Sequence, residues 1–171
     1  MELKIADSIV LREAVLSDLS ELEVFHREAE GYFSFDPSHS LTPPEICLKE
    51  GDLPPGGKRE NFSVYMIDVD ASPSGYLTLY RGYPDGETVY LCFFYLSGSV
   101  RRKGVGSRTV GALCGALREK GFVRARVAVS LKNWPGIRFW QTCGFGRITR
   151  VSFDAPFSAE NYGCLELEKV L

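Results

Sequence analysis

The sequence predicts an α/β fold with a mixed, mostly antiparallel central sheet of about seven strands, one parallel strand–helix–strand crossover, and helices on both faces. Short apolar runs separated by turn-forming residues indicate antiparallel strands joined by short loops. A helical pattern that ends at Gly121 separates two later runs, and a helical crossover returns the chain to the same end of a sheet, so those two strands should be parallel. The length of 171 residues, without a long linker, predicts a single domain over residues 1–171.

The first third of the chain is predicted to hold one strand and two helices. Residues 9–12 form a short apolar strand, after which Ser17 or Asp18 can cap a helix with one apolar side. A second helix should start at residues 42–45, where a proline occupies the first turn. The region 29–60 is otherwise the least regular part of the sequence.

The other predicted strands lie in the remainder of the chain. They cover residues 62–69, 76–80, 89–96, 125–129, 147–153 and 164–170. The run 89–96 is unbroken in its apolar character, which is typical of a strand buried on both faces. A helix with apolar residues at i, i+3, i+4 and i+7 follows it, and another helix should start near Asn133. The last two strands should close the sheet as an antiparallel pair.

Composition argues against several kinds of partner. A formal charge of −2 gives no support to nucleic acid or an anionic membrane as partner. The five cysteines are odd in number and lack a C-x-x-C pair, which indicates free thiols in a reducing cytoplasm. Neither of the two histidines has a cysteine or carboxylate at the spacing that metal ligands require, so no metal site is expected. We find no signal-peptide or transmembrane pattern and therefore expect a cytoplasmic protein.

A strand, a glycine-rich turn and a helix follow one another between residues 89 and 121. The first turn of a helix has unpaired N–H groups and the positive end of a dipole, which together favour a phosphate group. Arg101, Arg102 and Lys103 add positive charge just before Gly104 and Gly106. The spacing excludes a Walker P-loop, and the absence of a third glycine excludes a dinucleotide fingerprint.

The pattern R-x-x-G-x-G, at Arg101, Gly104 and Gly106, resembles the pyrophosphate loop of the GNAT superfamily of acyl-CoA N-acyltransferases. A second stretch, from Asn133 to Phe145, resembles the downstream motif of the same superfamily. It keeps the asparagine, the small, aliphatic and aromatic positions and the final Gly-Phe in register. Two motifs in the right order, together with the order of strands and helices, extend the resemblance over nearly the whole chain.

This resemblance implies an N-acetyltransferase that uses acetyl-CoA as acyl donor and no metal. The backbone of residues 102–107 would bind the pyrophosphate, and pantetheine would pair with the backbone of residues 94–96. The N–H of Leu96 would then act as the oxyanion donor. Asn133 would bind the pantetheine arm, and Ile137 and Trp140 would line the channel. The implied cofactor-binding residues are Phe94, Tyr95, Leu96, Arg101, Arg102, Lys103, Gly104, Val105, Gly106, Ser107, Asn133, Ile137 and Trp140.

Trp140 is a departure from the superfamily, which usually has a tyrosine there as general acid. An indole N–H can donate a hydrogen bond but is not a useful proton donor. The thiolate, whose pKa as a free thiol is roughly 8–9, can leave without a dedicated acid. Alternatively a tyrosine or water serves, or the protein binds CoA and catalyses poorly. The general base is also open: no carboxylate lies within residues 89–96, and Glu87 is the nearest.

The acceptor is expected to be an amine of a small molecule or peptide, attacking directly in a ternary complex. Its pocket should lie under the irregular region, with Tyr32, Phe33 and Phe35 as candidate lining residues and an excess of acids that hints at a cationic acceptor. The competing hypothesis is a catalytically weak or inactive acyl-CoA-binding module. A homodimer is compatible with the sequence.

Overall fold

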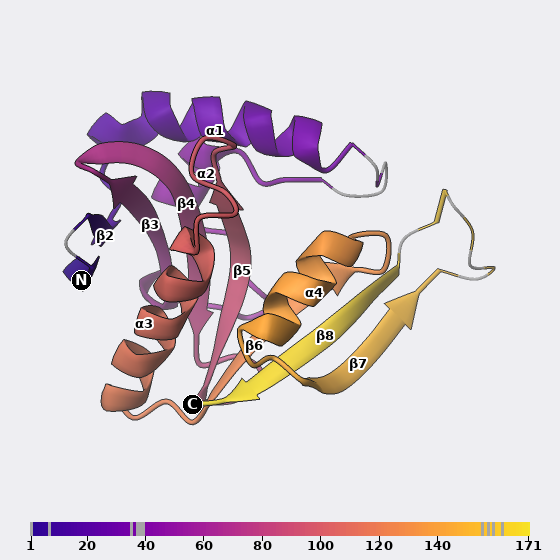
Figure 1. Ribbon diagram of the computed structural model, residues 1–171. Helices are drawn as coiled ribbons and strands as arrows, with labels where there is room; N and C mark the ends of the chain where they lie inside the picture. Colours follow the sequence, from indigo (N-terminus) through magenta and orange to yellow (C-terminus); the bar gives the residue numbers. More distant parts are fainter. Residues whose placement is uncertain are drawn as a thin grey trace.

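The structure is a computed structural model, which describes residues 2–6, 8–34, 36, 40–154, 156, 158, 160–161 and 163–171. These residues form one eight-stranded sheet in the order β1-β2-β3-β4-β5-β6-β8-β7 (Figure 1). The strands are β1 (Glu2–Ala6), β2 (Ile9–Glu13), β3 (Phe62–Val69), β4 (Ser72–Arg81), β5 (Thr88–Leu96), β6 (Arg124–Ser130), β7 (Arg147–Phe153) and β8 (Gly163–Val170). The helices are α1 (Leu19–Tyr32), α2 (Pro44–Lys49), α3 (Val105–Glu119) and α4 (Trp134–Thr142), with short 3₁₀ turns η1 (Leu16–Asp18) and η2 (Arg59–Asn61).

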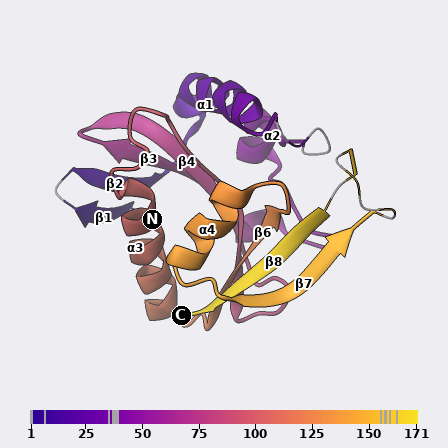
Figure 2. The ribbon, with the colours of Figure 1, turned by 45° about the vertical axis from the view of Figure 1, so that its right-hand side comes forward.

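The predicted fold class is confirmed. Every pair of neighbouring strands is antiparallel except β5 and β6, which the α3 crossover joins in parallel. The two faces of the sheet bury separate apolar cores, α3 and α4 packing on one face and α1 and α2 on the other (Figures 1 and 2). No helix among the described residues is long and apolar enough to cross a membrane.

One strand was missed by the sequence prediction. β1 alternates charged and apolar residues, and it pairs with β2 at the sheet edge. A five-residue segment with two charged side chains gives little apolar signal, because an edge strand is exposed on one side. β4 also begins earlier than predicted, at Ser72, because the hairpin closes through two residues of positive φ, Asp70 and Ala71.

Asp18 occupies the position before α1, as predicted, but its side chain does not cap that helix. Its carboxylate accepts hydrogen bonds from the Arg12 guanidinium at 2.8 and 2.9 Å and from the Val15 N–H at 2.8 Å. Arg12 also donates to Asp68 on β3 through Nε, at 2.7 Å. The start of α1 is therefore held against β2 and β3 by one arginine.

Gly75 lies where β4 approaches β5 most closely. A Cβ at this position would lie 2.2 Å from the Tyr95 carbonyl oxygen, which is backbone and cannot move aside. We predict that Gly75→Ala lowers the free energy of unfolding by about 1–3 kcal/mol, as overpacking typically does. Gly111→Ala, in the open middle of α3 with nothing within 4 Å, should be neutral or stabilising. Denaturant unfolding measures both, and equal effects would contradict the close approach.

The Arg12–Asp18 contact should make stability depend on pH. Hydrogen bonds from Arg12 hold the pKa of Asp18 below its ordinary value. A carboxyl with a lowered folded-state pKa stabilises the fold above its unfolded pKa of about 3.9 and loses this contribution on further acidification. Asp18→Asn should therefore lower the melting temperature at pH 7. The difference from the wild type should shrink below about pH 4 in a thermal-unfolding series.

Candidate acyl-CoA site

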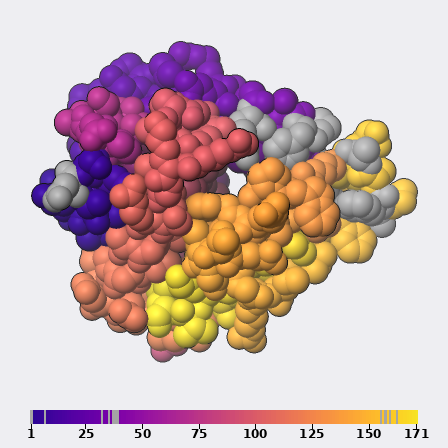
Figure 3. All heavy atoms as spheres, in the orientation of Figure 1, coloured from indigo at the N-terminus to yellow at the C-terminus, as the bar shows by residue number. Residues whose placement is uncertain are grey.

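The parallel pairing of β5 and β6 stops halfway along the strands. Thr88 to Leu91 of β5 pair with Arg124 to Val127 of β6, and no pairing follows. We call the stretch beyond it, residues 92–96 of β5 and 128–130 of β6, the β5–β6 opening. Figure 3 shows the surface hollowed between the segment after β5 and the start of α4. Ligands of open sheets bind at the carboxyl ends of parallel strands, which is where this opening lies.

Two backbone N–H groups of β5 point into this opening. The Ser97 N–H donates to the Ser74 carbonyl of β4 at 2.8 Å, and β4 and β5 keep an unbroken antiparallel register from there back to Phe93. Hydrogen bonds in such a ladder alternate from residue to residue. Leu96 and Phe94 therefore direct their N–H groups away from β4. Sequence reasoning named Leu96 as oxyanion donor; Phe94 offers a second N–H, nearer the paired end of the opening.

β5 is less buried than its sequence predicted. The register with β4 shifts between Thr78 and Leu79, which leaves Cys92 as the extra residue of a β-bulge. Cys92 is exposed, and Phe93 and Phe94 are only partly buried. The prediction of burial on both faces was wrong here because β6 diverges from this half of the strand.

The glycine-rich turn leads directly into α3. Gly104 is the residue before the helix and has a φ of 76°, which glycine adopts without the steric cost that a Cβ brings. No side chain in the described part of the chain caps α3, so its first-turn N–H groups face outward from an exposed turn. Arg102, with a φ of 60°, contributes to the same turn. This geometry suits an anion.

Glycine at position 106 is favoured by close packing. It lies within the first turn of α3, and positive φ is not what favours glycine there. A Cβ would lie 3.1 Å from the Phe139 ring and 3.3 Å from Leu96 Cδ1. The glycine therefore lets α3 pack closely against α4 and the end of β5.

Arg101 braces the end of β5. Its Nε donates to the Leu96 carbonyl at 2.6 Å, and its guanidinium lies 4.7 Å from the Tyr95 ring centroid. Arg102, Lys103 and Ser107 are exposed around the turn. Arg108, which sequence reasoning overlooked, donates to the carbonyls of Lys103 and Gly104 at 3.3 Å. Its place one helical turn after Gly104 was the available signal.

The start of α4 lies on the β6 side of the opening. Asn133 is buried, and its Oδ1 accepts a hydrogen bond from the Gly136 N–H at 2.9 Å, which makes it the helix N-cap. Ile137 and Trp140 are also buried. Trp140 meets Phe94, Phe139 and Phe145 edge to face, at centroid distances of 5.9, 5.1 and 5.1 Å. The indole thus fills the core beside the opening.

The structure does not bring Glu87 to the opening. Glu87 precedes β5, whereas Leu96 ends it, and a rise of about 3.3 Å per residue separates the two by on the order of 25 Å. Its carboxylate is exposed and forms an ion pair with Arg124. Tyr95, in contrast, lies near the end of β5 that borders the opening, and its hydroxyl donates to Glu28 of α1 at 3.1 Å. Burial raises the pKa of Tyr95 to about 12.

The irregular region between α1 and α2 reaches the end of β6. Phe33 packs near Phe93 with ring centroids 6.2 Å apart. Asp36 is buried, accepts a hydrogen bond from Ser130 and forms an ion pair with Lys132 at 3.3 Å. Sequence reasoning did not single out this contact. Phe35 and the side chain of Tyr32 lie outside the described residues.

The geometry can be compared with known proteins. The model of the Acetyltransferase (GNAT) family matches residues 22–145, which is most of the chain. The chain belongs to this family. The match confirms the resemblance carried by the two motifs and gives the chain's enzyme class as an acyltransferase. No curated protein sequence matches the chain significantly.

Solved structures share the fold at low sequence identity. An acetyl transferase from Salmonella typhimurium, which modifies the N-terminal serine of a 50S ribosomal subunit protein, has a TM-score of 0.78 and 14% identity, covering 100% of this chain and 99% of its own. An acetyltransferase from Thermus thermophilus has a TM-score of 0.72 and 18% identity, with 100% of both chains covered. The microcin self-immunity acetyltransferase MccE, solved with acetyl-CoA and AMP, has a TM-score of 0.74 and 17% identity over 98% of this chain and 95% of its own.

The hydrogen bond from Arg101 to the Leu96 carbonyl can be separated by mutation from the positive charge of the side chain. A lysine keeps the charge but lacks the planar Nε–H that reaches the Leu96 carbonyl. We predict that Arg101→Lys weakens acetyl-CoA binding nearly as much as Arg101→Met, by about tenfold, the loss of one charge-assisted hydrogen bond. Calorimetric titration measures this, with Arg118→Lys at the far end of α3 as control. Full affinity in Arg101→Lys would contradict the bracing role.

Proposed function

We propose that this protein is an acetyl-CoA-dependent N-acetyltransferase in which an amine attacks the thioester directly within a ternary complex. One observation carries the proposal: the parallel pairing ends at Leu91 and Val127, and two N–H groups of β5 point into the opening that results. The uncapped first turn of α3 stands next to that opening. The arrangement offers an anion site and an oxyanion site, joined by a strand edge.

Different residues would bind different parts of the acetyl-CoA donor. The N–H groups of Val105, Gly106 and Ser107, with the cations Arg102 and Lys103, would hold the pyrophosphate. Pantetheine would run along the free edge of β5, where Phe94 and Leu96 offer their backbone groups. The thioester lies at the end of the pantetheine arm that is farther from the pyrophosphate. The N–H groups of Phe94 and Leu96 are therefore both candidates for the oxyanion donor. Asn133, Ile137 and Trp140 would bound the other side.

The side chain of Trp140 cannot protonate the leaving thiolate. The indole is packed among Phe94, Phe139 and Phe145, which suits a wall better than a proton donor. A thiolate whose conjugate acid has a pKa of roughly 8–9 leaves without a dedicated acid when the reactants are well positioned. We therefore propose that positioning and backbone hydrogen bonds supply most of the rate enhancement.

The acceptor is proposed to be a primary amine of a peptide or a small molecule. One structural neighbour modifies a protein N-terminal serine, which makes peptide α-amines the first class to test. The five cysteines are free thiols, which supports a reducing, cytoplasmic location. All eight strands belong to one sheet, which supports a single domain over the whole chain.

The proposal is tested by release of CoA thiol from acetyl-CoA with serine- and alanine-initiated tetrapeptides, spermidine and glucosamine. We predict turnover with one or more of these amines. Gly104→Val should abolish it, because a β-branched residue is strained at a φ of 76° and closes the turn over the anion site. Gly121→Val, at a φ of 88° beyond the other end of α3, brings similar strain without touching the site and is the matched control.

Two outcomes separate this function from a non-catalytic binding module. Turnover that survives Gly104→Val would contradict the assignment of the loop. Thermal stabilisation of the wild type by acetyl-CoA, without release of CoA in the presence of any of the amines, would favour the binding module instead.

A further inference from the structure

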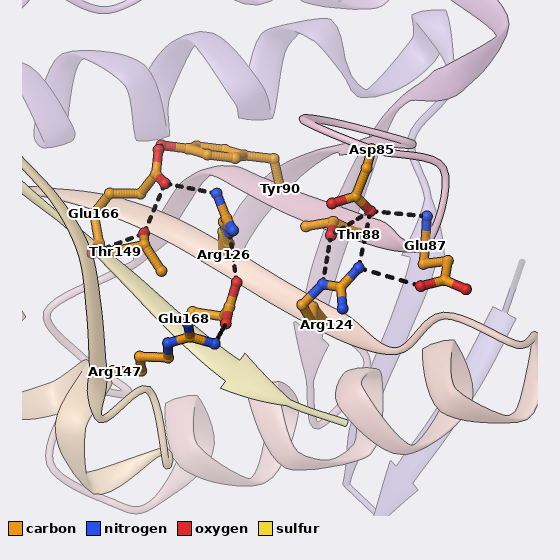
Figure 4. Close-up of polar contacts among 10 residues, drawn as sticks. All are labelled: Asp85, Glu87, Thr88, Tyr90, Arg124, Arg126, Arg147, Thr149, Glu166 and Glu168. Atoms are coloured by element: carbon orange, nitrogen blue, oxygen red, sulfur yellow. Dashed lines mark hydrogen bonds and ion pairs between the residues drawn. The ribbon is translucent and has the colours of Figure 1, made fainter.

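The face of the sheet opposite α3 and α4 carries a row of polar side chains across β5, β6, β8 and β7 (Figure 4). Neighbouring positions such as Val89, Leu91, Val127 and Leu167 belong to the core under α3 and α4, so the alternate positions lie on the other face. The residues in the row and at its ends are Asp85, Glu87, Thr88, Tyr90, Arg124, Arg126, Arg147, Thr149, Glu166 and Glu168. They include four carboxylates and three guanidinium groups, and Arg150 of β7 lies in register with Glu166.

The two carboxylate oxygens of Glu166, on β8, differ in the hydrogen bonds that they accept. Its Oε1 accepts hydrogen bonds from Arg126 at 3.0 Å and from Thr149 at 2.7 Å. From the residues that the structure describes, its Oε2 accepts one long hydrogen bond, from the Tyr90 hydroxyl at 3.3 Å. An ionised carboxylate has about four lone-pair sites, so Oε2 can accept further N–H donors.

The Glu166–Tyr90 contact crosses the base of the β5–β6 opening. Tyr90 pairs with Arg126, one step before the pairing ends at Leu91 and Val127. Glu166 pairs with Ala128, the first residue of β6 without a partner on β5. The methyl side chain of Ala128 leaves room for the tyrosine to reach over β6 to β8.

This pair is partly buried on the face of the sheet away from α3. The Glu166 side chain is 16% exposed, Tyr90 is partly buried, and the neighbouring Cys92 is exposed. The N-terminus of α3 approaches the opening from the other face. A donor anchored on α3 and an acceptor placed over Tyr90 would therefore meet in the opening from opposite sides of the sheet.

We propose that Glu166 Oε2 and the Tyr90 hydroxyl oxygen form a subsite for the ammonium group of a cationic acceptor. An ammonium has three donors and no acceptor, and it finds here a carboxylate oxygen and a phenol oxygen side by side. The subsite rests on the proposed acetyltransferase function and defines its acceptor as a molecule that carries an ammonium group.

The other acid of the row, Glu168, provides a matched control. It is buried and is bound on both sides, by Arg126 at 2.7 Å and by Arg147 at 3.0 Å. Replacing it disturbs the same arginine that holds Glu166 but removes no group from the subsite. A merely structural role for the row predicts similar kinetic effects of the two substitutions.

The experiment is steady-state CoA release by the full chain with whichever of the peptides, spermidine or glucosamine the wild type acetylates. Glu166→Gln, which is nearly isosteric, should raise the KM for the amine by about tenfold to a hundredfold, as expected for the loss of one charged partner. The KM for acetyl-CoA should stay within about twofold, since the donor binds on the other side. Tyr90→Phe keeps the ring contact with Tyr83 and should raise the amine KM by a smaller factor.

Glu168→Gln should lower the melting temperature and leave the KM for the amine within about twofold of the wild type. The inference is overturned if Glu166→Gln leaves that KM unchanged, or if Glu168→Gln raises it equally. A wild-type enzyme that releases CoA with none of these amines would overturn the proposed function, and the subsite with it. Turnover by the wild type with an unaltered KM in Glu166→Gln would overturn the subsite alone.

Discussion

The termination of parallel pairing between β5 and β6 is the constraint on which the site depends. Four paired positions hold the two strands together, and beyond Leu91 and Val127 they separate. The bulge at Cys92 accompanies the separation, since an extra residue bends one strand and increases its twist. Backbone N–H groups that a continuous sheet would use internally are thereby left for a ligand.

Most of the functional groups in this arrangement belong to the backbone. The Phe94, Leu96 and first-turn N–H groups of α3 are available to almost any sequence that keeps the path of the chain. Structural neighbours share the fold at 14–18% identity. The choice of residue is restricted at Gly106, which lets α3 pack closely against α4 and the end of β5, and at Asn133, which caps α4.

The sequence was informative where local patterns decide structure. Apolar runs and glycine turns located seven strands, and the spacing of Asn133, Gly144 and Phe145 carried half of the family resemblance that the family model confirms. β1 was missed because its pattern is weak at an exposed edge. Glu166 and Asp36 could not be placed, because their positions depend on the register between β6 and β8 and on a contact between distant segments. No local signal encodes such pairings.

Tyr95 contacts both sides of the site, with its hydroxyl on Glu28 of α1 and its ring under Arg101 of the loop. A ligand that shifts Arg101 therefore changes the surroundings of an α1 side chain on the opposite face of the sheet. Such coupling is reciprocal: the free energy by which occupancy near the loop alters affinity beside α1 equals the free energy of the reverse effect. Any cooperativity between ligands at these two places would then act through a single aromatic ring.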